Sequence, residues 1–305
     1  MVGEGVQAGE GCLDEISPLA LGAGERVGLL RKNCSTLGVA TRIQNRFVSL
    51  RSNERKGFIA YICAGDPGLE ETVEMVLCLE EAGADVVELG VPFSDPLADG
   101  VVNQQAAARA LKAGATLEGV LSAVRKIRES SDIPLVLFSY LNPLYAFGYE
   151  QIAAAAESAG VDGILVLDLP VEESDDYLAA LENRRLDNIY LVAPTSTDER
   201  IRRVCECGSG FIYCVSREGV TGIQDQLSPE ADSLLHRTRK HTDLPIALGF
   251  GVSNPEQAQA AVLHADAVVV GSAIVQRFHE APHDAEGRRE AASWVGRLVQ
   301  AVKEA

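Results

Sequence analysis

Three acidic side chains lie within the segment VVELGVPFSDPLADG, residues 86–100, which contains no Lys or Arg. Glu88 falls inside an apolar run, where burial raises a carboxyl pKa and suits the group to exchange a proton near pH 7. Asp99 follows in the next loop, where it can accept a hydrogen bond from a substrate N–H. Purely structural alternatives are an Arg partner for Glu88 and turn capping by Asp99. Asp95, before Pro96, fits a loop-structuring role.

Glycines follow three apolar runs in the second half of the chain, and each exposes main-chain N–H groups that an anion can approach. Ser272 also opens a short apolar helix, whose N-terminus favours negative charge. Together these positions predict a phosphate site, although a turn remains the alternative for Gly219. The predicted phosphate-binding residues are Gly222, Gly251, Gly271 and Ser272.

Eight short β-rich runs alternate with segments of helical period, which is typical of a parallel sheet covered by helices. The predicted strands are residues 58–63, 86–90, 134–140, 163–168, 188–194, 210–216, 245–251 and 267–273. The predicted helices are 70–82, 104–129 in two pieces, 151–159, 173–183, 198–207, 229–241, 255–264 and 286–305. This arrangement predicts a single (β/α)8 barrel of eight parallel strands, with an open doubly wound sheet as the alternative.

A (β/α)8 barrel builds its active site at the carboxyl ends of its strands. Glu88, Asp99 and the three glycine-containing strand ends would then surround one mouth. The order of the elements therefore predicts an acid pair and a phosphate site within a single pocket.

Composition excludes several classes of function. The chain has 305 residues, 47% apolar, and a formal net charge of −17, which argues against nucleic-acid binding. No apolar run is long enough to span a membrane. Seven scattered cysteines suit reduced thiols in the cytoplasm, with a plastid stroma as an alternative, and Cys205 and Cys207 lack the second pair of a zinc site. Residues 1–40 are predicted to be a flexible extension, and residues 41–305 the catalytic barrel.

Residues 87–100, VELGVPFSDPLADG, resemble the signature of the tryptophan synthase α subunit family. The resemblance continues through YICAGDPG, DLPVEES, SREGVTG, GFGVSNPEQ and GSAIV, and it covers the chain from about Thr41 onward. It implies a TIM-barrel lyase of tryptophan biosynthesis that cleaves indole-3-glycerol phosphate to indole and D-glyceraldehyde 3-phosphate. It implies no metal or organic cofactor on this chain.

The resemblance also assigns roles. Glu88 would be the general acid and base, and Asp99 would hold the indole N–H and stabilise positive charge on the ring. Tyr213 would lie near the reacting centre. The matching apolar positions would line the indole pocket, although each alone fits ordinary barrel core: Tyr61, Phe138, Leu165, Leu167, Val192 and Phe250.

A partner is implied as well. The family works with a β subunit that carries pyridoxal phosphate and consumes the indole, in a tetramer of two α and two β subunits. The loops with Pro92, Pro96 and Asp168 would form much of that contact. The sequence departs from the family at residues 101–104, Cys63 and Phe138, which puts rate and coupling in question rather than reaction type.

Three other functions remain open. A stand-alone lyase that releases free indole would use the same catalytic residues. A phosphosugar isomerase fits less well, because its signature would not include Asp99. A catalytically silent activator of the β subunit would be expected to lose the acid pair, whereas Glu88 and Asp99 are both present.

Overall fold

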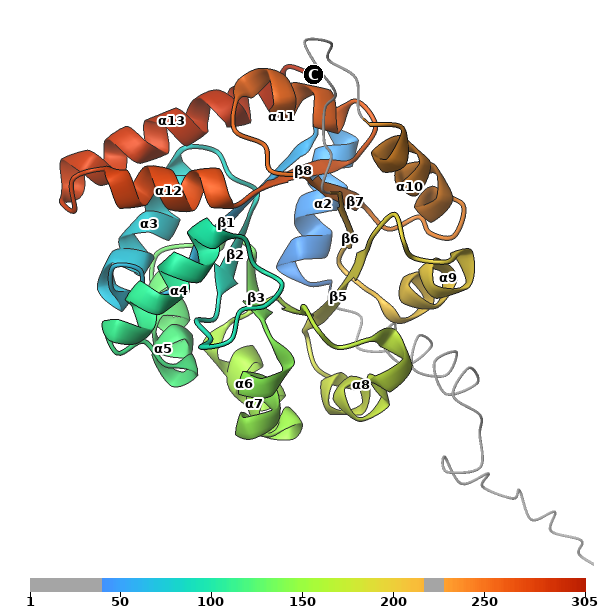
Figure 1. Ribbon diagram of the computed structural model, residues 1–305, viewed down its shortest axis with the longest axis horizontal. Helices are drawn as coiled ribbons and strands as arrows, with labels where there is room; N and C mark the ends of the chain where they lie inside the picture. Colours follow the sequence, from blue (N-terminus) through green and yellow to red (C-terminus); the bar gives the residue numbers. More distant parts are fainter. Residues whose placement is uncertain (1–39, 217–227) are drawn as a thin grey trace, which may run out of the picture.

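A computed structural model describes residues 40–216 and 228–305, where eight parallel strands form one closed barrel in chain order (Figure 1). β1 pairs with β8, with Gly57 opposite Ala267, so the predicted (β/α)8 barrel is confirmed and the open sheet is wrong. All eight predicted runs contain a strand. The strands are β1 (Gly57–Cys63), β2 (Val86–Gly90), β3 (Leu135–Ser139), β4 (Gly163–Val166), β5 (Asp187–Val192), β6 (Ile212–Val215), β7 (Ile246–Gly249) and β8 (Ala267–Val270).

Helices surround the barrel and connect successive strands (Figure 1). They are α3 (Leu69–Glu81), α4 (Val101–Lys112), α5 (Leu117–Arg128), α6 (Leu141–Phe147), α7 (Tyr149–Ala159), the 3-10 helix η2 (Val171–Glu173), α8 (Asp175–Leu181), α9 (Asp198–Cys207), α10 (Pro229–Arg239), α11 (Pro255–Val262), α12 (Ser272–Glu280) and α13 (Ala285–Lys303). The helix α6 was not predicted. None of the described helices is long and apolar enough to cross a membrane.

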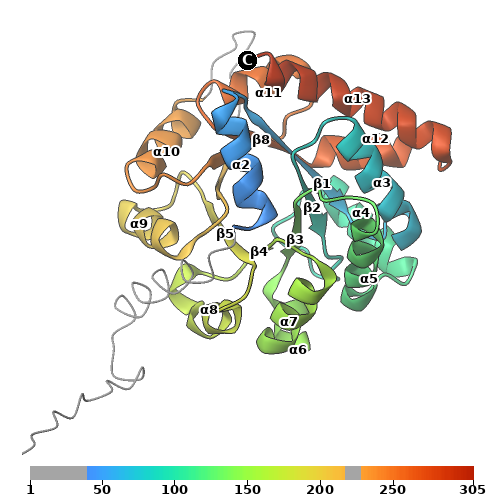
Figure 2. The same ribbon diagram turned by 180° about the vertical axis from the view of Figure 1, so that it is seen from behind.

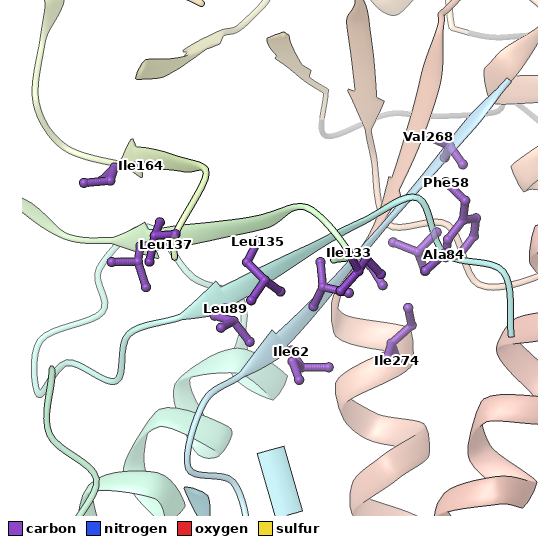
Figure 3. Close-up of a cluster of buried hydrophobic side chains, with 14 of the residues drawn as sticks. Phe58, Ile62, Ala84, Leu89, Ile133, Leu135, Leu137, Ile164, Val268 and Ile274 are labelled. Carbon is purple, nitrogen blue, oxygen red and sulfur yellow. The ribbon is translucent and has the colours of Figure 1, made fainter. Parts of the chain in front are cut away.

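Side chains alternate between the two faces of each strand, as the period of a strand requires. The outward-facing set, which includes Phe58, Leu89 and Leu137, packs against the helices, and Figure 3 shows part of it. The inward-facing set fills the barrel with one or two apolar side chains from each strand. Glu88 belongs to the inward face, in register with Tyr61 on β1 and Val136 on β3.

A further helix, α2 (Arg42–Ser52), closes the amino-terminal end of the barrel (Figure 2). Its buried residues Ile43, Phe47 and Leu50 join the inward-facing core, and the Phe47 ring lies 5.8 Å from that of Phe211. Thr41 caps the helix by accepting a hydrogen bond from the Gln44 N–H. The sequence prediction omitted this helix. The predicted flexible extension, residues 1–40, lies outside the described residues except for Ala40.

Aspartates at the amino-terminal end of the barrel bind the main chain of adjacent strands. Asp85, Asp162 and Asp266 accept the N–H groups of Phe58, Leu135 and Ile246 at 2.7, 2.9 and 2.8 Å. These acids stabilise strand ends. They are separated by the length of the barrel from the opposite mouth, where the candidate site lies.

Candidate active site

Glu88 is fully buried in β2 and faces the barrel interior. Neither carboxylate oxygen has a hydrogen-bond partner among residues 40–216 and 228–305, and no described Lys or Arg forms a salt bridge with it. The alternative of an Arg partner for Glu88 therefore finds no support among the described residues. Burial raises the pKa of Glu88 to about 8. At pH 7 most molecules carry a protonated Glu88, which can donate that proton and later recover one.

Two tyrosines adjoin Glu88 in the barrel interior. Burial raises the pKa of both Tyr61 and Tyr213, and the charge of Glu88 raises each further. The Tyr61 ring meets Phe138 edge to face, with centroids 5.0 Å apart. The Tyr213 ring packs over Gly249 of the next strand. The Glu88 carboxyl thus lies among aromatic rings, which suits contact with a flat apolar group.

Asp99 lies in the Asp99 loop, residues 91–100, which connects β2 to α4. The hydroxyl of Tyr140 donates to Asp99 Oδ2 at 2.9 Å, and Asn103 Nδ2 lies 3.5 Å from Oδ1. Burial raises the pKa of Asp99, while both hydrogen bonds act to lower it. Gly100, rather than Asp99, is the N-cap of α4, and no side chain caps it, so the structure gives no support to a capping role. Asp99 presents a weakly engaged oxygen at the mouth.

Asp95 is exposed and structures the same loop, as predicted. Its side chain accepts a hydrogen bond from Ser94 Oγ at 2.7 Å, and its carbonyl accepts the Leu97 N–H at 2.8 Å. These local bonds shape the loop near Asp99.

Two of the predicted phosphate positions, Gly251 and Gly271, follow the carboxyl ends of neighbouring strands, since β7 and β8 are paired. Gly251 has a φ of +79°, a conformation that favours glycine, and a Cβ added there would meet no atom within 4 Å. Gly271 is the N-cap of α12, which Ser272 begins, and no side chain caps this helix. Uncapped N–H groups at a helix N-terminus suit an anion. The remaining predicted position, Gly222, lies outside the described residues.

Some of the residues predicted to line the apolar pocket lie in or beside the barrel interior. Phe138, Leu165 and Leu167 belong to the inward-facing core or pack against it, and Tyr61 lies in the adjoining cluster. Val192 is a correction, because it belongs to the outward-facing core. Phe250 follows the last residue of β7 and is half-buried, with part of its surface packed against the outward-facing core, and its place in the indole pocket stays a prediction.

Leu191 takes the interior place expected for Val192. Adjacent residues of a strand face opposite sides, so a displacement of one residue exchanges a pocket position for a core position. Strict alternation from Ile189 would have identified Leu191.

An ion pair that was not predicted from the sequence anchors α4, the helix that follows the Asp99 loop. Arg109 of α4 binds Asp66, in the loop after β1, through two bonds of 2.9 and 2.6 Å. Gln104, in the first turn of α4, donates to the Asp99 carbonyl at 2.9 Å. The helix that follows Asp99 is therefore fixed to both neighbouring loops.

A cavity of about 680 Å³ lies at the opposite end of the barrel, between α2 and the segment 239–245. Its arginines are already engaged. Arg51 donates to the Asp243 carbonyl, and Arg239 binds the Leu244 carbonyl and Asp266. This cavity contains none of the predicted site residues.

Comparisons with known proteins identify the family of this chain. The model of the family described as "Tryptophan synthase alpha chain" matches residues 47–304. The tryptophan synthase alpha chain of Solibacter usitatus is 49% identical over 240 residues, covering 79% of this chain and 90% of its own. That of Geotalea uraniireducens is 45% identical over 263 residues, covering 86% and 98%.

Solved structures give the same result. The crystal structure of tryptophan synthase subunit alpha from Legionella pneumophila superposes with a TM-score of 0.80 at 34% identity, covering 88% of this chain and all of that one. This chain belongs to the tryptophan synthase alpha chain family. It is a carbon–carbon lyase of tryptophan biosynthesis, and its reaction is the alpha reaction, cleavage of indole-3-glycerol phosphate to indole and glyceraldehyde 3-phosphate.

Membership in the alpha chain family accounts for the eight-stranded barrel, but it does not by itself assign roles to individual side chains. The positions of Glu88, Asp99 and the uncapped α12 are properties of this chain. They provide the basis for the roles that follow.

Proposed function

We propose that Glu88 and Asp99 perform the alpha reaction as proton carrier and charge-stabilising group, with no metal or organic cofactor on this chain. The observation that carries this proposal is the buried Glu88 carboxyl, which faces the barrel interior without a described hydrogen-bond partner and has a pKa of about 8. A group with that pKa exists in both protonation states near neutral pH, as a residue that must donate and then accept a proton requires.

The reaction then follows from these positions. Protonated Glu88 donates its proton to indole C3, which places positive charge on the ring, and Asp99 stabilises that charge by accepting the indole N–H. The Glu88 carboxylate next removes the proton of the side-chain hydroxyl. The bond to C3 breaks, its electrons return to the ring, and the hydroxyl carbon becomes the aldehyde. Glu88 ends protonated, ready for another cycle.

The substrate phosphate would bind where β7 and β8 end. Main-chain N–H groups near Gly251 and Gly271 and the exposed Ser272 support this placement, because α12 contributes the positive end of its dipole. A chain of net charge −17 cannot attract a phosphate ester by its overall field, so local donors must hold it. The indole would lie against Tyr61, Phe138 and Leu165.

The partner of this chain would be a tryptophan synthase β subunit, which carries pyridoxal phosphate and consumes the indole within an assembly of two α and two β subunits in the cytoplasm. Leu97 and Val101 support a partner at the active-site mouth, since these apolar side chains are 91% and 67% exposed beside Asp99. The loops with Pro92, Pro96 and Asp168 would complete the contact.

The catalytic roles are tested by comparing the purified chain with its Glu88→Gln variant. The wild-type chain is expected to release indole from indole-3-glycerol phosphate, and Glu88→Gln to lower kcat at least a thousandfold. Binding of an indole propyl phosphate, which lacks the reactive hydroxyl, should change less than threefold. Glu129→Gln, at the exposed C-cap residue of α5, is the matched control. Wild-type turnover in Glu88→Gln would overturn this mechanism.

The partner is tested by titrating a purified β subunit into the same assay. Stimulation of cleavage and loss of free indole from solution would support the paired enzyme. High turnover that the β subunit leaves unchanged would instead identify a stand-alone lyase that releases indole.

A further inference from the structure

Tyr140 joins two parts of the chain that contribute to the active-site mouth. It follows β3 directly, and its hydroxyl donates to Asp99 Oδ2 at 2.9 Å while accepting the Ala98 N–H at 3.0 Å. One phenol thus holds both the side chain of Asp99 and the main chain beside it, across 41 residues of sequence.

The ring of Tyr140 is itself held in place. It is 5% exposed, and its centroid lies 5.3 Å from that of Phe93 in the Asp99 loop. Ser139 Oγ donates to the Tyr140 carbonyl at 2.8 Å, and Asp168 accepts the N–H of the following residue, Leu141, at 2.6 Å. A hydroxyl on so restricted a ring can orient the group that it binds.

The hydrogen bond from Tyr140 makes the two carboxylate oxygens of Asp99 unequal. Oδ2 is occupied by Tyr140, whereas Oδ1 has Asn103 at 3.5 Å, the outer limit of a hydrogen bond. Oδ1 is therefore the oxygen that can accept a new donor. We propose that Tyr140 is a positioning residue for the alpha reaction, whose hydroxyl fixes the Asp99 carboxylate so that Oδ1 accepts the indole N–H of the substrate. This inference rests on the proposed role of Asp99.

The same bond favours the ionised form of Asp99, which the reaction needs when the ring becomes positive. Burial raises the pKa of Asp99, and the Tyr140 hydrogen bond opposes that rise. The other titratable groups that interact with Asp99 are Tyr61 and Cys63 of β1, and burial raises the pKa of each, so both stay neutral below pH 9. Loss of the Tyr140 hydroxyl should therefore raise the pKa of Asp99.

The test is a double-mutant cycle on the full chain with Tyr140→Phe and Asp99→Asn. Tyr140→Phe keeps the ring and should lower kcat/KM ten- to a hundredfold, the range for a hydrogen bond to a charged group. The same change in the Asp99→Asn background should lower kcat/KM less than twofold, because the hydroxyl then has no carboxylate to orient. Tyr145→Phe, an exposed tyrosine on α6, serves as the control and should match the wild type.

The proposal is overturned if Tyr140→Phe keeps wild-type kcat/KM, or if it causes an equal loss in both backgrounds. A second measurement needs no substrate. The pKa of Asp99, followed by carboxyl NMR, should rise in Tyr140→Phe and stay unchanged in Tyr145→Phe. An unaltered Asp99 pKa would reject the positioning role even if the wild-type chain failed to cleave indole-3-glycerol phosphate, a failure that would reject the proposed function instead.

Discussion

The hydroxyl oxygen of Tyr213 lies 2.6 Å from the position that a Cβ atom on Gly249 would occupy. Two ring carbons lie within 3.1 Å of the same point, so the ring as a whole, and not its hydroxyl alone, depends on this glycine. The absence of a side chain on β7 therefore determines where an aromatic ring of β6 stands beside Glu88.

Gly249→Ala should displace Tyr213 and lower kcat at least tenfold, with a loss of about 1–3 kcal/mol in unfolding free energy from overpacking. Gly296→Ala, within α13, is the control, because the nearest atom to a Cβ added at Gly296 is the Ala82 carbonyl oxygen, at 3.8 Å. Steady-state kinetics and urea unfolding measure both effects. Unchanged kcat in Gly249→Ala would show that the Tyr213 position does not matter to the reaction.

Glu88 should make stability depend on pH. Its pKa is about 8 in the folded chain against an ordinary value of 4.5, so between these values the folded state holds a proton that the unfolded state has lost. The contribution to stability is complete below pH 4.5 and declines by about 1.4 kcal/mol per pH unit up to about pH 8. We expect urea unfolding at pH 5.5 and 8 to show that the free energy of unfolding of Glu88→Gln increases relative to that of the wild type as pH rises. A constant difference would contradict the raised pKa.

Leu191 and Val192 should respond differently to truncation. Leu191→Ala opens the barrel interior and should raise the KM for indole-3-glycerol phosphate several-fold, since each methylene in an apolar pocket contributes about 1 kcal/mol or more. Val192→Ala removes outward-facing core and should cost about 2 kcal/mol of unfolding free energy with little change in KM. A raised KM in Val192→Ala together with an unchanged KM in Leu191→Ala would show that Val192, and not Leu191, lines the pocket.

Arg109→Gln should leave Asp66 buried without its cation. The Asp66 side chain is 8% exposed and that of Arg109 30%, so the expected cost is about 1–3 kcal/mol, less than for a fully buried pair. Arg202→Gln, from the exposed pair with Glu206, should cost about 0.5 kcal/mol or less. Thermal unfolding of both variants provides the comparison, and equal costs would contradict a stabilising role for the Asp66 pair.

Phe47→Ala should cost about 3–5 kcal/mol, because α2 buries this ring within the barrel end. Val48→Ala, one residue further and 65% exposed, should change stability by less than about 0.5 kcal/mol. Differential scanning calorimetry separates the two, and a mild effect of Phe47→Ala would mean that α2 contributes little to the core.

The sequence allowed the barrel and the interior place of Glu88 to be predicted, because alternation of strands with helices and an acid inside an apolar run are local signals. The helix α2, which was not predicted, also has a local signal in the helical spacing of Ile43, Phe47 and Leu50. Val192 was misplaced by a single residue, and a strand reverses its faces at each residue.

The contact between Tyr140 and Asp99 had no local signal. It joins two loops 41 residues apart, and neither loop has a period from which orientation could be derived. The pairing of Arg109 with Asp66 has the same origin, since 43 residues separate them. Such contacts exist because the closed barrel brings successive βα loops to one mouth, so they follow from the fold rather than from any segment of sequence.

Closure of the barrel through β1 and β8 has a consequence for synthesis of the chain. Phe58 to Ala60 on β1 pair with Val268 to Val270 on β8, near the other end of the polypeptide. Until the ribosome has released Val270, one edge of β1 has no strand to bind, and an unpaired apolar edge invites association with other chains. The nascent chain therefore spends most of its translation with this edge of β1 unpaired, and closure of the barrel must wait until β8 has been made.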